Sequence, residues 1–158
     1  MADATPLCDE VIELLSSGAV MSAGTCDAAL TPECVSVMGV RAHRDRRSLT
    51  IYVPAALAGP TLANIAGNGL VALNVTRPGD EKSMQIKGRV LAVRDAADAD
   101  RAVVELYRGA LGERMAFVGL PRAITRRLTW WPSKAIEVGV AEVFVQTPGP
   151  GAGSPLAG

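Results

Sequence analysis

Apolar residues recur along the chain with two different periods, which separate helices from strands. Leu7, Val11, Leu14 and Leu15 repeat at the 3.6-residue spacing of an amphipathic helix, and Gly18 ends that pattern. Six later stretches have the apolar or alternating character of strands. We expect these strands at 19–25, 33–41, 48–53, 70–75, 83–93 and 135–146.

Two further helices follow from the same patterns. Leu57, Leu62 and Ile65 share one helical face, and the glycines on either side of Asn68 end it. The segment 95–112 begins with aspartates, which favour a helix N-terminus. We expect its buried stripe to consist of Ala99, Val103, Leu106 and Ala110.

The order of these elements predicts a mainly β fold with flanking helices (α+β). Most connections are too short for a parallel crossover, so the strands should pair antiparallel. A six-stranded barrel, closed or partly open, removes exposed strand edges. We expect one domain over 1–146 and a flexible tail rich in proline and glycine over 147–158.

The composition of the chain argues against several classes of function. The net charge is zero, which argues against nucleic-acid binding, because phosphate recognition needs an excess of lysine and arginine. No apolar stretch approaches the eighteen or so residues that span a bilayer, so we expect no membrane association. The three cysteines have neither the number nor the spacing of a disulfide framework or a zinc site. A reducing cytoplasm is the simplest setting.

No catalytic motif is present, and no residue can be assigned a catalytic role. His43 is the one histidine, so two-histidine metal centres are excluded within a chain, and we expect no metal site. In its charged turn His43 is either a solvated loop residue, which we favour, or a general base. If the protein catalyses a reaction, a cofactor should supply the chemistry.

Two local features leave alternatives open. Arg122, Arg126 and Arg127 share a helical face shortly before Trp130 and Trp131, which predicts either a packed basic helix end, which we favour, or an anion-binding platform. The polar side of the strand at 83–93 presents Gln85, Lys87 and Arg89, which are either solvated or line a pocket for a planar anionic ligand.

Nearly the whole chain resembles a known family. The segments SGAVMSAGTCD, LTIYVPAALAGPTLANIAGNGLVALNV and MQIKGRVLAV, in this order, are similar to the FMN-binding split barrel of the pyridoxamine 5′-phosphate oxidase-like superfamily, including small bacterial members. The resemblance covers about 7–146. It implies a Greek-key split barrel that forms a homodimer with two FMN sites at the subunit interface.

The resemblance also implies which residues meet the cofactor. The flavin ring would lie against Met38 and Val40 and against the strand end Val53, Pro54 and Ala55. Ser83, Met84 and Gln85 would approach the polar edge of the ring, and Trp131 would contact it from the partner subunit. The phosphate would lie at Thr61 and Leu62.

At the phosphate end the sequence departs from the family. Members carry a serine and a pair of cations before the helix, where this chain has Gly59, Pro60 and Thr61. Charge-assisted bonds contribute about 1.5 to 3 kcal/mol each, so the loss of two should weaken FMN binding. Compensation is expected from the hydroxyl and amide of Thr61 and the amide of Leu62 at the helix N-terminus, with Arg41 or Arg89 as the cation that reaches in.

Two functions therefore remain open. The first is an FMN-dependent oxidoreductase or flavin-binding protein of unspecified substrate. The second is a non-enzymatic split-barrel dimer that has lost FMN and binds another small ligand or has a structural or stress-related role.

Overall fold

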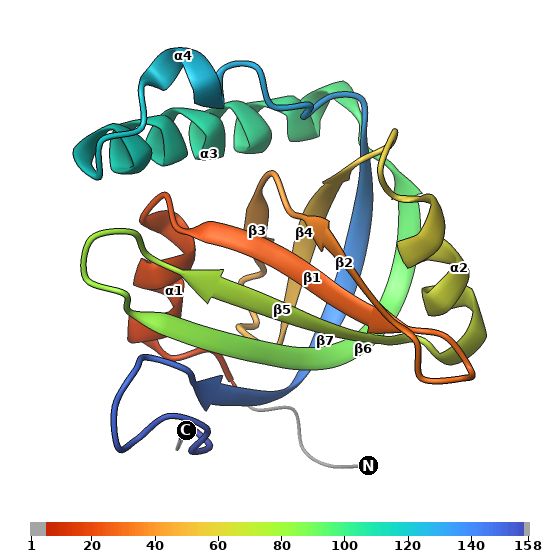
Figure 1. Cartoon of the computed structure of the whole chain (residues 1–158). Coiled ribbons are helices and arrows are strands. Elements are labelled where there is room, and N and C mark those ends of the chain that lie inside the picture. The colour runs from red at the N-terminus through yellow and green to blue at the C-terminus, as the bar shows by residue number, and fades with distance from the viewer. Residues whose placement is uncertain (1–5, 157–158) are drawn as a thin grey trace.

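The strands form one antiparallel sheet with the order β2-β1-β5-β6-β7-β4-β3, coiled into a barrel that stays open between β2 and β3 (Figure 1). A computed structural model describes residues 6–156. The strands are β1 (Val20–Cys26), β2 (Pro32–Ser36), β3 (Val40–Ala42), β4 (Ser48–Pro54), β5 (Leu70–Thr76), β6 (Ser83–Asp95) and β7 (Ser133–Val145). The helices are α1 (Asp9–Ser16), α2 (Gly59–Asn68), α3 (Asp98–Phe117) and α4 (Arg122–Thr125).

The described residues contain seven strands, so the expectation of six was wrong. The predicted strand at 33–41 is two strands, because the chain changes partner in its middle. The amide of Val37 donates to Met21 on β1, whereas the amide of Met38 donates to Tyr52 on β4. Gly39 follows with a φ of 150°, and β3 then pairs with β4. This corner joins the two edges of the sheet and leaves the barrel split.

The long strands β6 and β7 bend around the barrel at a close approach of two glycines. A Cβ atom on Gly88 would lie 2.2 Å from the carbonyl oxygen of Gly139. The register of the pair shifts between Lys87 and Gly88, as a β-bulge does. A side chain at position 88 would therefore force the two strands apart.

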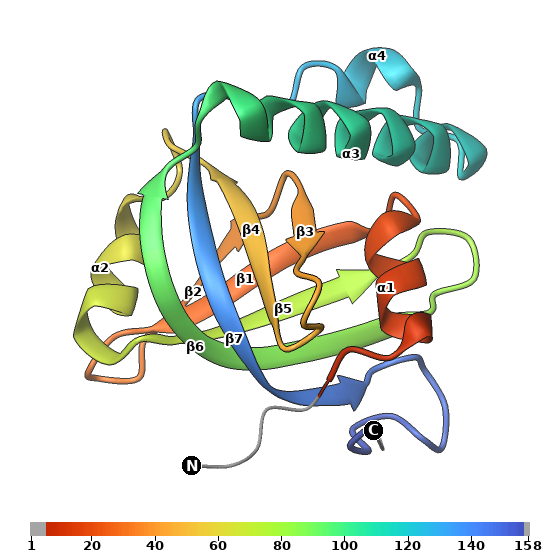
Figure 2. The same ribbon diagram turned by 180° about the vertical axis from the view of Figure 1, so that it is seen from behind.

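The helices cover the parts of the barrel that the sheet leaves open. Figure 2 shows α3 across one end, with α1 and α2 on opposite sides. Helix α1 buries Val11, Leu14 and Leu15, as its sequence pattern predicts. Helix α2 packs against β1 and β2 and buries Thr61 and Ile65.

The predicted buried stripe of α3 was displaced by one position. Leu106 is 77% exposed, and the residues that face the barrel are Asp100, Val104, Tyr107 and Leu111. An aspartate is ordinarily assigned to the solvent side of a helix. Here it lies in the buried stripe because partners on the barrel bind its carboxylate.

Asp100 is 4% exposed and joins α3 to three strands of the barrel. Tyr52 on β4 donates its hydroxyl to Oδ1 at 2.7 Å, and Arg94 on β6 donates to Oδ2 at 2.6 Å. Arg41 on β3 lies 3.4 Å from Oδ1. The amide of Ala97 donates to Oδ2 at 3.0 Å and so caps the helix. The orientation of α3 is thereby fixed at its first turn.

The surroundings of Asp100 and Tyr52 shift the pKa values of both side chains. The Arg94 guanidinium holds the pKa of the Asp100 carboxyl well below its usual range, and the hydrogen bonds from Tyr52 and Ala97 act in the same direction. Burial, with a further contribution from Asp100, raises the pKa of Tyr52 to about 12. At neutral pH the pair is a carboxylate that accepts from a neutral phenol.

The segment at 147–156 returns along β7. The amide of Val145 donates to Ser154, and the amide of Leu156 donates to Val143. Thr147 accepts from the amide of Ser83 through its hydroxyl. Leu156 packs against the core although the sequence offers this segment no apolar pattern.

We predict that Asp100→Ala lowers the free energy of unfolding by about 3 kcal/mol, because it leaves Tyr52 and Arg94 without their buried partner. Asp98→Ala removes an exposed carboxylate from the same helical turn and should cost less than about 1 kcal/mol. Urea denaturation measures both changes. Equal losses would show that Asp100 does not fix α3.

The stability should also depend on pH through Asp100. Its pKa is lowered in the folded state, so its contribution is complete above the unfolded value of about 4 and is lost as the pH falls below that value. Asp100→Asn should therefore show a shallower loss of stability between about pH 5 and pH 3. Urea midpoints across this range test the expectation, and parallel curves for the two proteins would contradict it.

Candidate functional site

The structure separates the eleven predicted site residues into two groups. One lies where β4 ends, below α3. There the amide of Ala55 donates to the carbonyl of Pro132 at 2.8 Å, which brings the end of β4 beside the Trp131 segment. This first group consists of Met38, Val40, Val53, Pro54, Ala55, Thr61, Leu62 and Trp131. The resemblance implied that Trp131 meets the flavin from the partner subunit, but here it lies beside the end of β4 in its own chain.

The second group, Ser83, Met84 and Gln85, opens β6 at the far end of β5. Met84 pairs with Val145, the last residue of β7, whereas Pro54 of the first group pairs with Ser133, the first residue of that strand. The thirteen residues of β7 span about 40 Å along the strand. One chain therefore does not bring the two groups together, and a site that contains both needs a second copy.

Several of the predicted site residues are too buried for their side chains to touch a ligand. Met38, Val53 and Met84 are at most 4% exposed and pack inside the barrel. The Ser83 hydroxyl is bonded to Thr76 and to the carbonyl of Val75. The side chains that remain partly exposed are those of Val40, Ala55, Leu62, Gln85 and Trp131.

The N-terminus of α2 contains a carboxylate that sequence reasoning missed. Glu33 lies on β2 opposite Thr25, and its Oε2 accepts from the Thr25 hydroxyl at 3.1 Å. The hydroxyl of Thr61, a fully buried residue, donates to the same oxygen at 2.7 Å. Asn64 donates to the Thr25 oxygen at 3.0 Å. The first turn of α2 has no acidic residue of its own, so β2 supplies the anion at this helix end.

The tryptophans lie against arginines of α3. Trp130 has the guanidinium of Arg108 4.1 Å from its ring centre and that of Arg101 at 5.3 Å, and Arg101 is also 5.4 Å from Trp131. Arg122 pairs with Glu113 on α3. This arrangement agrees with the packed helix end that we favoured, although the arginines that stack are not those of the 122–127 segment.

His43 lies in the β3–β4 connection with both ring nitrogens occupied. Nε2 is 2.8 Å from the Thr50 hydroxyl, and Nδ1 is 3.0 Å from that of Ser48. The Ser48 hydroxyl also contacts Asp45. The ring is therefore partly buried and bonds two residues of β4 to this hairpin connection. It is not the solvated loop side chain that we favoured.

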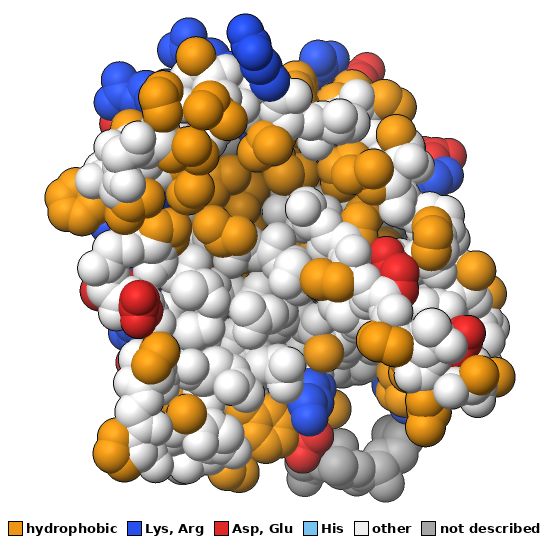
Figure 3. All heavy atoms as spheres, in the orientation of Figure 1, with side chains coloured by type: hydrophobic (Ala, Val, Ile, Leu, Met, Phe, Trp, Pro, Cys, Tyr) orange, Lys and Arg blue, Asp and Glu red, His pale blue; other side chains and the backbone are white. Residues whose placement is uncertain are grey.

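The surface between the two groups has little charge. Figure 3 shows an apolar band under α3 and α4, with an uncharged area over β1, β5 and β6 below it. The band surrounds a groove of about 220 Å³ whose walls include Val20, Leu120, Ile124 and Leu128. The outward residues of the area below are Ser22, Gly24, Ser36, Ala72, Asn74 and Gln85. We call these six residues the uncharged face.

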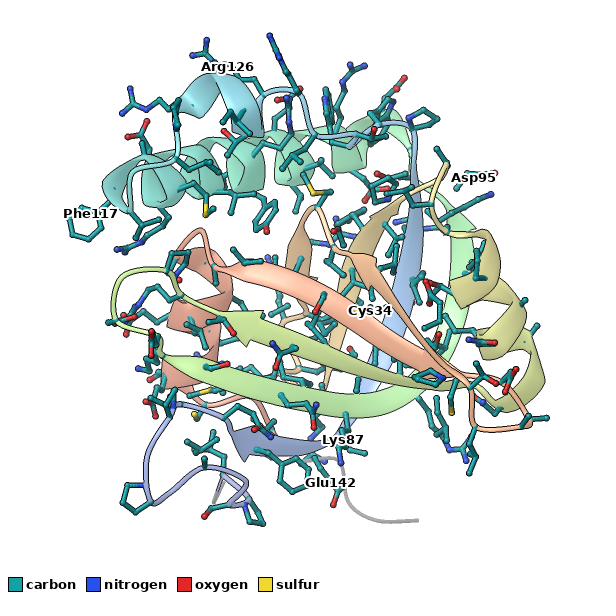
Figure 4. All side chains as sticks on the ribbon, viewed as in Figure 1. Cys34, Lys87, Asp95, Phe117, Arg126 and Glu142 are labelled. Carbon is teal, nitrogen blue, oxygen red and sulfur yellow. The ribbon has the colours of Figure 1, made fainter. Side chains whose placement is uncertain are left out.

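Charged side chains lie beyond the edge of this face. Lys87 and Glu142, labelled in Figure 4, lie on adjacent strands beside a wider groove of about 660 Å³. Its floor is made of small residues, Gly24, Ala72, Gly88 and Gly139. Lys87 also lies 4.6 Å from the ring centre of Phe144, and Arg89 donates to the carbonyl of Asn68.

No family model and no curated protein matches the chain. Solved structures do. HupZ from Group A Streptococcus has a TM-score of 0.56 at 16% identity, over 93% of this chain and 100% of its own. An FMN-binding protein from Syntrophomonas wolfei has a TM-score of 0.55 at 9% identity, over 84% and 80%. A pyridoxamine 5′-phosphate oxidase-related, FMN binding protein from Nostoc punctiforme has a TM-score of 0.51 at 11% identity, over 96% and 89%.

The chain has the split-barrel fold of the pyridoxamine 5′-phosphate oxidase-like FMN-binding proteins. The residues that the resemblance assigns to the two ends of FMN lie in different surroundings. The partly exposed Val40, Ala55, Leu62 and Trp131 are apolar or aromatic and suit a planar ring. The α2 N-terminus does not suit a phosphate, because the Thr61 hydroxyl is already donated to Glu33.

The two cations expected to compensate are engaged elsewhere. Arg41 pairs with Asp100, and Arg89 donates to Asn68 at the opposite end of α2. Like charges 4 Å apart repel by about 4 kcal/mol at the effective dielectric constant of a protein surface. A phosphate beside Glu33 would therefore be repelled without a compensating contact from either arginine.

Other classes of site are absent from the part of the chain that the structure describes. Residues 6–156 contain no cluster of three or more histidine, cysteine, aspartate or glutamate side chains suited to a metal ion. Within the same range no helix has the length and apolarity needed to cross a membrane.

Proposed function

We propose that the chain is a flavin-binding protein of the oxidoreductase type, which holds the flavin ring at the seam of a homodimer. One observation supports the proposal most strongly: the two groups of predicted site residues lie at opposite ends of β7, and the surface between them carries little charge. The FMN-binding proteins that share the fold support a flavin as the ligand.

In the proposed site each chain contributes one half. The end of β4 and the first turn of α2 give an apolar wall, with Ala55 and Leu62 toward the ring. The partner subunit's Gln85 gives an amide for the polar edge of the ring. A bound flavin would supply the transfer of electrons or hydride. The protein residues would orient the ring and keep water away from it.

The homodimer is part of this proposal. Depletion of charge is typical of the centre of a protein interface, and an apolar band of the kind beneath α4 is typical of a contact surface. The uncharged face and the band are continuous (Figure 3). Two copies that meet there would cover both and would bring Gln85 of one chain toward the β4 end of the other.

A non-enzymatic dimer without flavin is the second candidate. The observation that favours it is the contact between Glu33 and Thr61, which fills the place where related proteins are expected to hold a phosphate. The binding experiment below separates the two candidates.

The first experiment measures flavin binding directly. The protein should quench the fluorescence of added flavin in a saturable manner. Ala55→Trp should weaken this binding at least tenfold, because the indole would occupy the space of the flavin ring. Ala102→Trp makes the same change at an exposed position of α3 and should bind as the unchanged protein does. If the unchanged protein quenches neither FMN nor riboflavin, the second candidate is favoured.

The second experiment measures the oligomeric state. Light scattering after size-exclusion chromatography should give twice the mass of 16.4 kDa. Asn74→Lys should shift the protein toward monomer, because it buries an unpaired charge in the seam. Ala102→Lys adds the same charge on the outer side of α3 and should remain dimeric. A monomer for the unchanged protein would refute the shared site.

A further inference from the structure

We propose that Glu33 selects the ligand: it excludes a phosphate from the N-terminus of α2 and accepts a hydrogen bond from a terminal hydroxyl in its place. The flavin taken by this chain would then be of the riboflavin class, without a phosphate at this end. This inference rests on the proposed flavin site and concerns the end of that site away from the ring.

Glu33 lies beside the N-terminus of α2. Glu33 and Val35 lie on the same side of β2, and the hydrogen bond from Thr61 shows that the carboxylate points toward α2. Two hydroxyl donors, from Thr25 and Thr61, hold its Oε2. The residue is only partly buried, so the carboxylate still borders the surface.

The first turn of α2 has no positive charge and few free donors to hold a phosphate. Residues 58–62 contain no cation, Pro60 has no amide hydrogen, and the amide of Leu62 donates to Ala58. Thr61 has already donated its hydroxyl to Glu33. A phosphate entering here would meet a carboxylate and a helix end with few free donors.

A flavin of the riboflavin class ends in a hydroxyl, which suits the carboxylate of Glu33. A terminal hydroxyl is a donor, and a carboxylate is an acceptor with several lone pairs, of which the two threonines use only part. Hydrogen bonds to a charged acceptor are about twice as strong as neutral ones. The residue that repels a phosphate therefore attracts the unphosphorylated end of the same molecule.

The test compares riboflavin and FMN as ligands of three proteins, by quenching of flavin fluorescence. The unchanged protein should bind riboflavin at least tenfold more tightly than FMN, which corresponds to about 1.4 kcal/mol. Glu33→Gln keeps an acceptor for Thr61 but removes the charge. It should bind FMN about tenfold more tightly and riboflavin about threefold more weakly. Changes of opposite sign distinguish ligand selection from general damage to the fold.

Glu137→Gln is the matched control, because it neutralises a partly exposed carboxylate on β7 near His43 instead. Its affinities for both flavins should stay within twofold of those of the unchanged protein. Pro60→Arg adds a cation at an exposed position without disturbing the Thr61 contact and should also improve FMN binding about tenfold.

The outcomes separate the two proposals. If the unchanged protein binds FMN as tightly as riboflavin and Glu33→Gln alters neither affinity, ligand selection by Glu33 is refuted while the flavin site stands. If neither flavin binds to any of the proteins, the flavin site is refuted and the selection with it.

Discussion

The buried carboxylate of Asp100 is the contact on which the arrangement of the candidate site depends. It connects α3 to β3, β4 and β6 through Arg41, Tyr52 and Arg94. Because α3 lies across the barrel end, its angle sets the position of the apolar band and of the Arg101 and Arg108 side chains that pack on Trp130. The Trp131 segment is in turn bonded to Ala55 at the end of β4.

Two acidic residues of this molecule face inward and have different kinds of partner. Asp100 is paired with two arginines and a tyrosine, so its charge is matched and it stabilises the fold. Glu33 has hydroxyl partners, Thr25 and Thr61, so its charge is solvated but not neutralised. A carboxylate paired with cations, such as Asp100, holds elements of the fold together. A carboxylate with hydroxyl partners only, such as Glu33, would favour a neutral donor over an anion in a ligand beside it.

The split between β2 and β3 sets how the two groups of candidate site residues are arranged in one chain. The chain passes from one edge of the sheet to the other at 37–39, so the barrel never closes and its ends depend on helices for cover. The residues suited to a ring and those suited to its polar edge are held at opposite ends of β7. In the proposed site a second copy would bring them together, so oligomeric state and ligand binding belong to one hypothesis.

The sequence by itself determined the local structure. The alternation in β6, the apolar spacing of α1 and the short connections were sufficient for an antiparallel barrel, closed or partly open, with helices, because these patterns reflect contacts between near neighbours. That the barrel is split was implied by the family resemblance. The break of the predicted strand at 33–41, the buried position of Asp100 and the inward carboxylate of Glu33 were decided by tertiary structure. Each depends on a partner distant in sequence, such as Tyr52 or Thr61, and a charged residue gives no local sign that such a partner exists.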